Sequence, residues 1–291
     1  MPPMGAVDII IPTFKRHKSL AQTLASVQQQ THSDWTCWIA EDGETAQTQK
    51  TIKPFLSDSR FRYIPGPHTG IPAVPRNRAI ARGQAPYIAF LDDDDLWVPN
   101  KLEQQIKHME EHPDCVLLGS NAYRWPGTQQ WDSRLPLYFE SMISGKTSYE
   151  ALAENNWIIN SSAVIRRSAL EQAGPLNESP ELAAYEDYEL WLRIGVLGDI
   201  WISEEPLVVY RDAPQQSLRS AADEKNHYKR LSKTYFSAVN GTGGTPSPLA
   251  RPENSRHTRL CRKQGRRYGS CPPRTSLTKT VVKIFQSLFN R

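Results

Sequence analysis

The sequence predicts an α/β protein in which helices flank a mostly parallel central sheet. Two observations carry this prediction. Short apolar runs such as Val7–Ile11 alternate with helical patterns and end at polar residues, as buried parallel strands do. The first strand, helix and strand follow in that order, which implies a right-handed βαβ unit. With 291 residues the chain is long enough to bury a core of full size.

The expected elements follow from local signals. The first strand stops at Pro12, which cannot donate to a strand ladder. Ser19 is the expected N-cap of a helix to about Gln30, and residues 121–160 are aromatic-rich and expected to be irregular. The further elements are strands at Trp35–Ala40, Phe61–Ile64 and Tyr87–Leu91, helices over Arg76–Arg82 and from Pro99, strands at Val116–Leu118 and Ala163–Ile165, helices over Ser168–Ala173 and Glu186–Val196, and strands at Trp201–Ile202 and Leu207–Tyr210.

Charge is unevenly distributed along the chain. Residues 251–291 contain eleven Lys or Arg and one acid, so 24 of the 35 basic and 30 of the 31 acidic residues fall in residues 1–250. We expect a catalytic or binding domain over 5–220, a helix and Gly/Ser/Pro linker over 221–245, and a basic, flexible tail over 246–291 whose end suits an amphipathic helix. The tail is either a solvated extension, which its composition favours, or a peripheral contact with an anionic membrane; nucleic acid is not expected as a partner.

Several protein classes are excluded by what the sequence lacks. The four cysteines form no CxxC pair, zinc spacing or disulfide framework, so a reducing compartment is the default. The N-terminus reaches a polar loop too soon for a signal peptide, and no run approaches the roughly 20 apolar residues of a membrane-spanning helix. We therefore expect a cytoplasmic protein, with peripheral contact at the inner face of the plasma membrane as an option.

Four consecutive carboxylates, Asp92–Asp95, directly follow the apolar run Tyr87–Leu91. They are expected just past the carboxyl end of a buried strand, the edge of an open α/β sheet where ligands bind. Adjacent carboxylates repel one another unless a cation or hydrogen-bond donors neutralise them. This run is either a site for a divalent metal that carries a phosphorylated ligand or a solvated acidic turn.

Two further polar groups are expected at the same edge. Asp42 ends the second strand, where it can accept a hydrogen bond from a base edge, and Phe14 can cover a flat ring; Asp42 before Gly43 is equally typical of a turn. Arg76 and Asn77 begin a helix after a loop rich in Pro and Gly. They form either a phosphate contact or a solvated helix start.

Glu186 and Asp187 open the helix at Glu186–Val196. Acids in a first helical turn stabilise the helix macrodipole, which is the structural interpretation. The functional interpretation is a catalytic base that deprotonates an acceptor hydroxyl, and Asp187 is the preferred candidate.

The ordered motifs resemble the family 2 glycosyltransferases, which have the GT-A fold. The resemblance covers roughly residues 5–220. It implies transfer of a sugar from a nucleoside diphosphate sugar to an acceptor hydroxyl (a glycan, polysaccharide or lipid-linked acceptor of the cell envelope), with inversion. The motifs that carry it are Asp8–Arg16, Glu41–Gly43, Pro75–Ala79, Phe90–Trp97, Asn160–Arg167, Glu186–Arg193 and Pro206–Arg211.

The resemblance also implies roles for individual residues. Asp187, with Glu186, would be catalytic, and Asp94 and Asp92 would bind Mn²⁺ or Mg²⁺. The aromatic rings of Trp97, Trp157 and Trp191 are weaker candidates for acceptor contacts. The nucleotide-sugar would bind Pro12, Thr13, Phe14, Arg16, Asp42, Arg76, Asn77, Asp92 and Asp93.

One departure from the family pattern concerns the metal. Relatives often carry a histidine shortly after the Tyr-Arg that ends the last strand, whereas none follows Tyr210 and Arg211 here. Asp212 could substitute. The sequence leaves two alternative functions: a sugar nucleotidyltransferase, which would need glycine in the loop after Pro12, and a non-catalytic nucleotide- or membrane-binding protein that acts through its basic tail.

Overall fold

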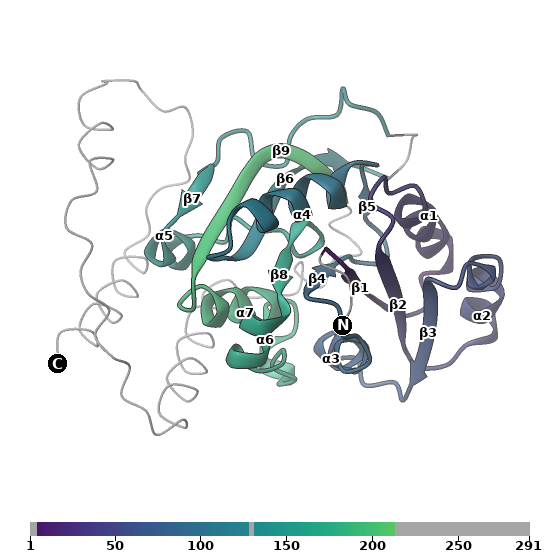
Figure 1. Ribbon diagram of the computed structural model, residues 1–291. Helices are drawn as coiled ribbons and strands as arrows, with labels where there is room; N and C mark the ends of the chain where they lie inside the picture. Colours follow the sequence, from purple (N-terminus) through teal and green to yellow (C-terminus); the bar gives the residue numbers. More distant parts are fainter. Residues whose placement is uncertain (1–4, 128–130, 213–291) are drawn as a thin grey trace, which may run out of the picture. The chain divides into compact units, whose positions relative to one another are not determined.

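The computed structural model describes residues 5–127 and 131–212, which form one sheet with helices on both faces (Figure 1). The α/β prediction is therefore confirmed. The predicted linker and basic tail, and the end of the predicted domain at residue 220, lie outside the described residues. Among those residues, no helix is both long and apolar enough to cross a membrane.

Nine strands of the described chain lie side by side in the order β3-β2-β1-β4-β8-β6-β9-β5, with β7 also paired to β9. The first four in space are parallel, whereas β8 runs antiparallel to both β4 and β6. The strands are β1 (Val7–Thr13), β2 (Trp35–Asp42), β3 (Phe61–Gly66), β4 (Tyr87–Phe90), β5 (Leu96–Trp97), β6 (Cys115–Trp125), β7 (Gly145–Thr147), β8 (Val164–Arg166) and β9 (Asp199–Arg211).

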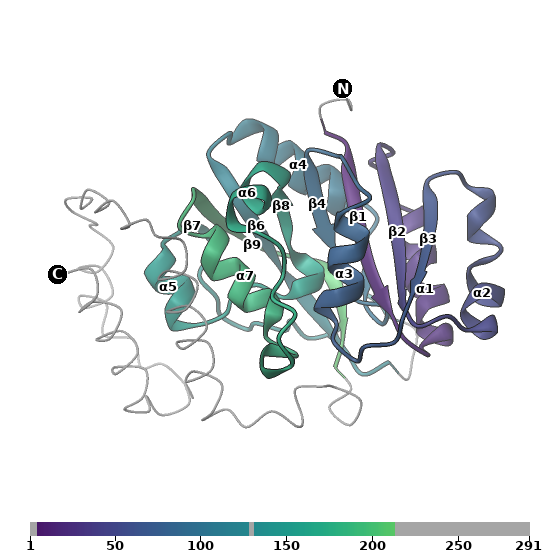
Figure 2. The ribbon, with the colours of Figure 1, turned by 90° about the horizontal axis from the view of Figure 1, so that it is seen from below.

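Helices cover both faces of this sheet, and Figure 2 shows α3, α6 and α7 on the opposite side from α1 and α4. Helix α1 begins at His17, with Arg16 rather than Ser19 as the N-cap residue. The helices are α1 (His17–Gln28), α2 (Ala46–Ile52), α3 (Ala73–Ile80), α4 (Lys101–Glu111), α5 (Tyr149–Glu154), α6 (Arg167–Ala173) and α7 (Glu186–Ile194), with single 3₁₀ turns at Phe55–Ser57, Asn160–Ser162 and Pro180–Leu182.

The sequence-based assignment is incomplete, because α2, α5, β5 and β7 correspond to no predicted element, and it is wrong at the long strands. The two short strands expected after residue 200 are one continuous strand, β9, and β6 continues to Trp125 through residues expected to be irregular. These two strands pair in parallel over most of their length, with register shifts around Asn121. The shifts explain the error, because they break the alternating pattern on which a strand prediction depends.

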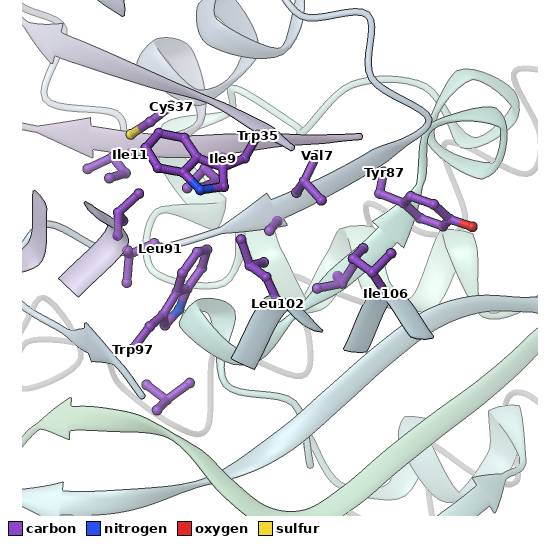
Figure 3. Close-up of a cluster of buried hydrophobic side chains, with 14 of the residues drawn as sticks. Val7, Ile9, Ile11, Trp35, Cys37, Tyr87, Leu91, Trp97, Leu102 and Ile106 are labelled. Atoms are coloured by element: carbon purple, nitrogen blue, oxygen red, sulfur yellow. The ribbon is translucent and has the colours of Figure 1, made fainter. Parts of the chain in front are cut away.

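The core beneath α1 and α4 explains why the β1 pattern is continuously apolar. Val7, Ile9 and Ile11 project to this face and are fully buried (Figure 3). Ile10 is equally buried from the other face, where Phe90 of β4 meets the Trp191 ring of α7 at 5.4 Å. Each such aliphatic side chain contributes about 1.5–3 kcal/mol when it leaves water, so both helical layers stabilise the strands that carry the site.

Asp8 is the one charged residue within β1, and it is 2% exposed. It accepts hydrogen bonds from the Trp38 indole N–H at 2.7 Å and the Ala85 main-chain N–H at 2.8 Å, and it pairs with the Arg167 guanidinium at 2.6 Å. These contacts join β1, β2, the loop before β4 and α6. The carboxylate is therefore a buried cross-link between segments that no local pattern connects.

We predict that Asp8→Ala lowers the free energy of unfolding by about 3–5 kcal/mol, because it leaves the Arg167 charge buried without its partner. Urea unfolding of both proteins measures the change. Asp58→Ala is the matched control, since its partner Arg60 lies two residues away at the surface, and about 1 kcal/mol or less is expected there. Equal losses for the two variants would contradict the assignment.

Cys37 and Cys115 are both buried and unpaired, and burial raises the pKa of the Cys115 thiol to about 12. We predict that neither reacts with iodoacetamide in the native protein at pH 8 and that both react in 6 M urea, because the thiolate is the nucleophile. Mass spectrometry of the peptides that carry these two residues provides the measurement. Rapid native labelling of either would show that the core is not packed as described.

Candidate active site

The carboxyl ends of β1, β2 and β4 meet at one edge of the sheet, because these three strands are parallel neighbours. Thr13 pairs in register with Glu41, and Asp42 is the last residue of β2. The Asp92–Asp95 run begins two residues after the last residue of β4. The expectation that the polar strand ends converge is therefore met by the geometry of the sheet.

Asp42 fastens the loop that follows β3. Its carboxylate accepts hydrogen bonds from the main-chain N–H groups of Thr69 and Gly70, both at 2.8 Å, and from the Thr69 hydroxyl at 2.9 Å. Burial acts to raise the pKa of Asp42, but these donors hold it below its ordinary value. His68 Nδ1 lies 2.9 Å from the same carboxylate. Asp42 is thus engaged by its own chain in this structure.

The same loop forms one wall of a pocket beside Phe14. The imidazole ring of His68 stacks on the Phe14 ring, with centroids 4.1 Å apart and planes 7° from parallel. A cavity of about 500 Å³ adjoins this pair, lined by Gly43, Glu44, Pro65, Gly66, Pro67 and His68. An aromatic stack beside a cavity of this size suits a flat heterocycle. His68 was not among the residues singled out from sequence.

Arg76 joins the acidic run to helix α7. Its guanidinium pairs with Asp92 at 2.7 Å and with Glu186, and only 7% of its side chain is exposed. Burial acts to lower the pKa of Arg76, but the two carboxylates raise it, so the residue stays charged. The Arg76–Glu186 pair therefore joins residues 110 positions apart in sequence and links helix α7 to the acidic run.

Arg76 and Asn77, expected at a helix start, lie inside α3, which begins at Ala73. Arg76 is directed at protein carboxylates rather than presented to a ligand. Asn77 holds the loop after α6, since its amide donates to the Leu176 carbonyl at 2.8 Å and accepts from the Leu176 N–H at 3.0 Å. In the absence of ligand, both residues are therefore engaged in contacts within the protein.

Asp93 and Asp94 face a second arginine, Arg16. The guanidinium forms an ion pair with Asp94 Oδ2 and lies 3.7 Å from Asp93. Burial, and then the neighbouring Asp94 carboxylate, raise the pKa of Asp93 to about 7. Burial also raises the pKa of Asp94, against the opposing effect of Arg16. The run therefore carries more negative charge than its surroundings neutralise.

Asp95 is turned into the core and holds the turn in place. It is 1% exposed, accepts from the Ser161 hydroxyl at 2.5 Å and from the main-chain N–H of Arg211 at 2.8 Å. Ser161 in turn accepts from the Asp92 N–H at 3.1 Å, and the Asn160 amide donates to the Asp92 carboxylate at 2.8 Å. These partners lie in two of the motifs that carry the family resemblance, although no role was assigned to them from sequence.

Glu186 and Asp187 lie at the first turn of α7, and their environments differ. Glu186 is 4% exposed and is held by Arg76, while its Oε2 has no hydrogen-bond partner in the described part of the chain. Asp187 Oδ1 accepts from the N–H of Tyr188 at 2.7 Å. Of the two, Glu186 is bound to the site's framework, so Asp187 remains the better candidate for proton transfer.

The structure corrects two of the three tryptophans proposed for the acceptor. Trp97 is 1% and Trp191 0% exposed, so neither can present a ring face to a sugar. Trp97 donates from its indole N–H to the Ser161 carbonyl at 2.8 Å, and Trp191 packs on Phe90. Trp157 is half-buried against Phe139 and stays a candidate.

The donor set at the acidic run suits a hard divalent cation only in part. Asp92 and Asp94 offer carboxylate oxygens and keep 32% and 22% of their side chains exposed. Over residues 5–127 and 131–212, no three His, Cys, Asp or Glu side chains are placed to hold a metal ion. Asp212, the expected substitute for the missing histidine, pairs with Arg124. The residues therefore fit a cation whose remaining ligands come from a bound phosphate group.

Comparisons with known proteins agree on the family. The model of the family described as Glycosyl transferase family 2 matches residues 8–174. The putative colanic acid biosynthesis glycosyl transferase WcaA of Escherichia coli K12 is 29% identical over 203 residues, which cover 68% of this chain and 70% of WcaA. WfgD of Escherichia coli, named as a UDP-Glc:alpha-D-GlcNAc-diphosphoundecaprenol beta-1,3-glucosyltransferase, is 29% identical over 65% of this chain and 69% of its own length.

Solved structures share the fold at low identity. Staphylococcus aureus TarS 1–349 in complex with UDP-GlcNAc aligns with a TM-score of 0.65 and 16% identity, over 81% of this chain and 67% of that one. The match spans 40% of the longer TarS chain. The mannosyltransferase PcManGT of Pyrobaculum calidifontis, in complex with GDP-Man and Mn²⁺, aligns with a TM-score of 0.54 and 14% identity over 83% of this chain and 66% of its own.

The family match favours a glycosyltransferase over the two alternatives, a sugar nucleotidyltransferase and a binding protein that acts only through its tail. The mixed sheet, the acidic run at its ligand-binding edge and the family match lead to one assignment: the chain belongs to glycosyl transferase family 2, and it is a glycosyltransferase with a GT-A fold.

Proposed function

We propose that the protein transfers a sugar from a nucleoside diphosphate sugar to an acceptor hydroxyl in one inverting displacement, with Asp187 as the base. The observation that carries this proposal is the Arg76 bridge between Asp92 and Glu186. It brings the first turn of α7 to the acidic run at the end of β4. A proton acceptor therefore stands beside the group of residues that suits a diphosphate and its cation.

The donor's base is proposed to bind at the Phe14–His68 stack and the adjoining cavity. Because the Asp42 carboxylate already accepts from the loop at Thr69 and Gly70, its role is to hold that wall as well as to meet the base edge. The ribose and diphosphate would then extend toward Asp93 and Asp94, with Arg16 as the nearest cation to the diphosphate. Pro12 and Thr13, the last two residues of β1, would contact the nucleotide from the end of that strand.

Asp94 and Asp92 would hold Mn²⁺ or Mg²⁺, which when bound neutralises the departing diphosphate. The presence of Mn²⁺ in the PcManGT complex supports a divalent metal in this fold. The ion pair with Arg76 orients Asp92, and the hydrogen bond from Ser161 to buried Asp95 anchors the turn in the core. These contacts orient the carboxylates before any ligand arrives, which lowers the free energy needed to organise the site.

Transfer needs one proton acceptor and no protein nucleophile. The acceptor oxygen forms a bond to the anomeric carbon while the bond from that carbon to the diphosphate breaks, and the hydroxyl proton passes to Asp187. A single displacement of this kind inverts the anomeric configuration. Glu186, already paired with Arg76, positions α7 and leaves proton transfer to its neighbour.

The acceptor is proposed to be a saccharide on a lipid diphosphate, because WfgD is named for such an acceptor. Trp157, half-buried beside Phe139, is the aromatic candidate for contact with its sugar ring. A lipid-linked acceptor would place the enzyme at the inner face of the plasma membrane. The basic tail proposed to bind anionic lipid there lies outside the described residues.

We predict that Asp187→Asn lowers kcat by about 10²–10⁴-fold while leaving the affinity for the nucleoside diphosphate within about twofold, because the amide cannot accept the hydroxyl proton. Nucleotide release and isothermal titration measure the two quantities. Glu181→Gln, an exposed acid just before α7, is the control and should leave both unchanged. Loss of nucleotide binding in Asp187→Asn would contradict the role as base.

We predict that Asp94→Ala weakens nucleoside diphosphate binding by about tenfold or more in the presence of Mn²⁺, as removal of one charged contact of about 1.5 kcal/mol implies. Without metal the effect should be smaller or reversed, because Asp94 then only repels the diphosphate. Titrations with UDP and GDP, with and without Mn²⁺, provide the measurement. Exposed Asp114→Ala should bind as the wild type does; a metal-independent loss in Asp94→Ala would count against a metal ligand.

A further inference from the structure

The guanidinium of Arg16 is bound to Asp94 through the oxygen Oδ2. Asp94 is also the residue proposed to ligate the metal. Asp93, the second carboxylate near this arginine, lies 3.7 Å away and is 9% exposed. A positive group of this chain therefore occupies the carboxylate that a divalent cation would use.

The main chain of Arg16 is held by the start of α1, whereas its side chain is partly exposed. Its carbonyl accepts from the N–H of Leu20 and from the Ser19 hydroxyl, both at 3.0 Å, as the first turn of α1 begins. The preceding residue, Lys15, has a φ of 54°, a left-handed conformation that non-glycine residues adopt infrequently. This tight turn returns the chain from the end of β1 to the acidic run, and 35% of the Arg16 side chain remains exposed.

The other arginines around the run are held in a different way. Arg76 is 7% exposed and bridges two carboxylates, so its departure would leave both without their partner in a buried setting. Arg211 is tied down by its own N–H to Asp95 and by its Nε–H to the Asp94 carbonyl, with its guanidinium 4.1 Å from the Trp125 ring centroid. Arg16 meets the run through its guanidinium, at the end of a long and partly exposed side chain.

We propose that Arg16 is an internal counter-ion of the acidic run that a divalent metal must displace from Asp94, and that this competition couples metal binding to nucleotide binding. The proposal rests on the proposed function, because the displaced guanidinium needs a new anionic partner, which the donor's diphosphate supplies. Metal alone has to remove Arg16 into solvent. When metal and nucleoside diphosphate bind together, the Arg16 guanidinium moves from Asp94 to the diphosphate. Each ligand therefore raises the affinity for the other.

The coupling has a physical basis in the shared oxygen. A carboxylate oxygen that accepts from a guanidinium N–H cannot at the same time take a metal at ligand distance on that side, because the two cations repel one another. With Arg16 in place part of the run's negative charge is offset in the absence of ligand, which limits the repulsion among its carboxylates. The ion pair therefore stabilises the free enzyme and weakens its affinity for metal alone.

The test compares Mn²⁺ binding to the full-length wild type and Arg16→Gln, followed by the electron paramagnetic resonance signal of free Mn²⁺. Without nucleotide, Arg16→Gln should bind Mn²⁺ about three- to tenfold more tightly, the range expected for loss of a partly exposed competing ion pair. With saturating UDP or GDP, whichever the wild type binds, this advantage should disappear or reverse. The nucleotide-dependent gain in metal affinity is therefore smaller in the variant.

Two further variants keep the result interpretable. Lys15→Gln removes an exposed positive charge from the adjacent residue, and it should leave the nucleotide-dependent gain unchanged, which separates competition from a general change in charge. Arg16→Lys keeps the charge but not the planar fork, and should lie between the wild type and Arg16→Gln. Thermal melting confirms that each variant is folded; if Arg16→Gln is not, Arg16→Lys alone decides the sign of the effect.

The outcomes are distinct. Unchanged or weaker Mn²⁺ binding by folded Arg16 variants without nucleotide overturns the inference, and so does an advantage of the same size with and without nucleotide. If the wild type binds neither UDP, GDP nor any donor, the proposed function fails, while the metal-only comparison still decides whether Arg16 competes for Asp94.

Discussion

Four adjacent carboxylates at the end of β4 are the constraint around which the described structure is arranged. Left alone, Asp92–Asp95 would repel one another and destabilise the turn. The acids are instead met by partners from several parts of the chain: Asp92 by Arg76, Asp93 and Asp94 together by Arg16, and Asp95 by Ser161 and the main chain of Arg211. The partners come from the loop after β1, from α3, from the turn before β8 and from the end of β9.

This arrangement explains why distant parts of the chain have to meet for the site to exist. The parallel strands set the edge, and the antiparallel β8 brings Asn160 and Ser161 against the acidic turn. Helix α7 is attached to the same turn through Glu186 and Arg76, which places Asp187 beside it. The site is therefore organised in the absence of ligand, and binding energy can be used to move Arg16 rather than to assemble the framework.

Most of the fold could be predicted because its signals are local. The apolar residues of β1, β2 and β4 form short continuous runs, and the polar residues that follow them end at the edge that parallel pairing requires. The errors at the long strands occur where pairing is irregular. The β6–β9 ladder contains register shifts, and the residues between 203 and 206 look like a break between two strands although they lie within one.

The sequence by itself determined the parallel βαβ start of the sheet and the acidic run at its edge, and it made Asp187 the candidate base, because these depend on residue type and spacing along the chain. Only the tertiary structure decided which charges are paired. It directed Arg76 to Asp92 and Glu186, buried Trp97 and Trp191 in the core, used Asp42 to hold the Thr69–Gly70 loop, and set Arg16 on Asp94. The physical reason is that the partner of a charge and the exposure of a ring are set by residues far away in sequence, which local patterns cannot report.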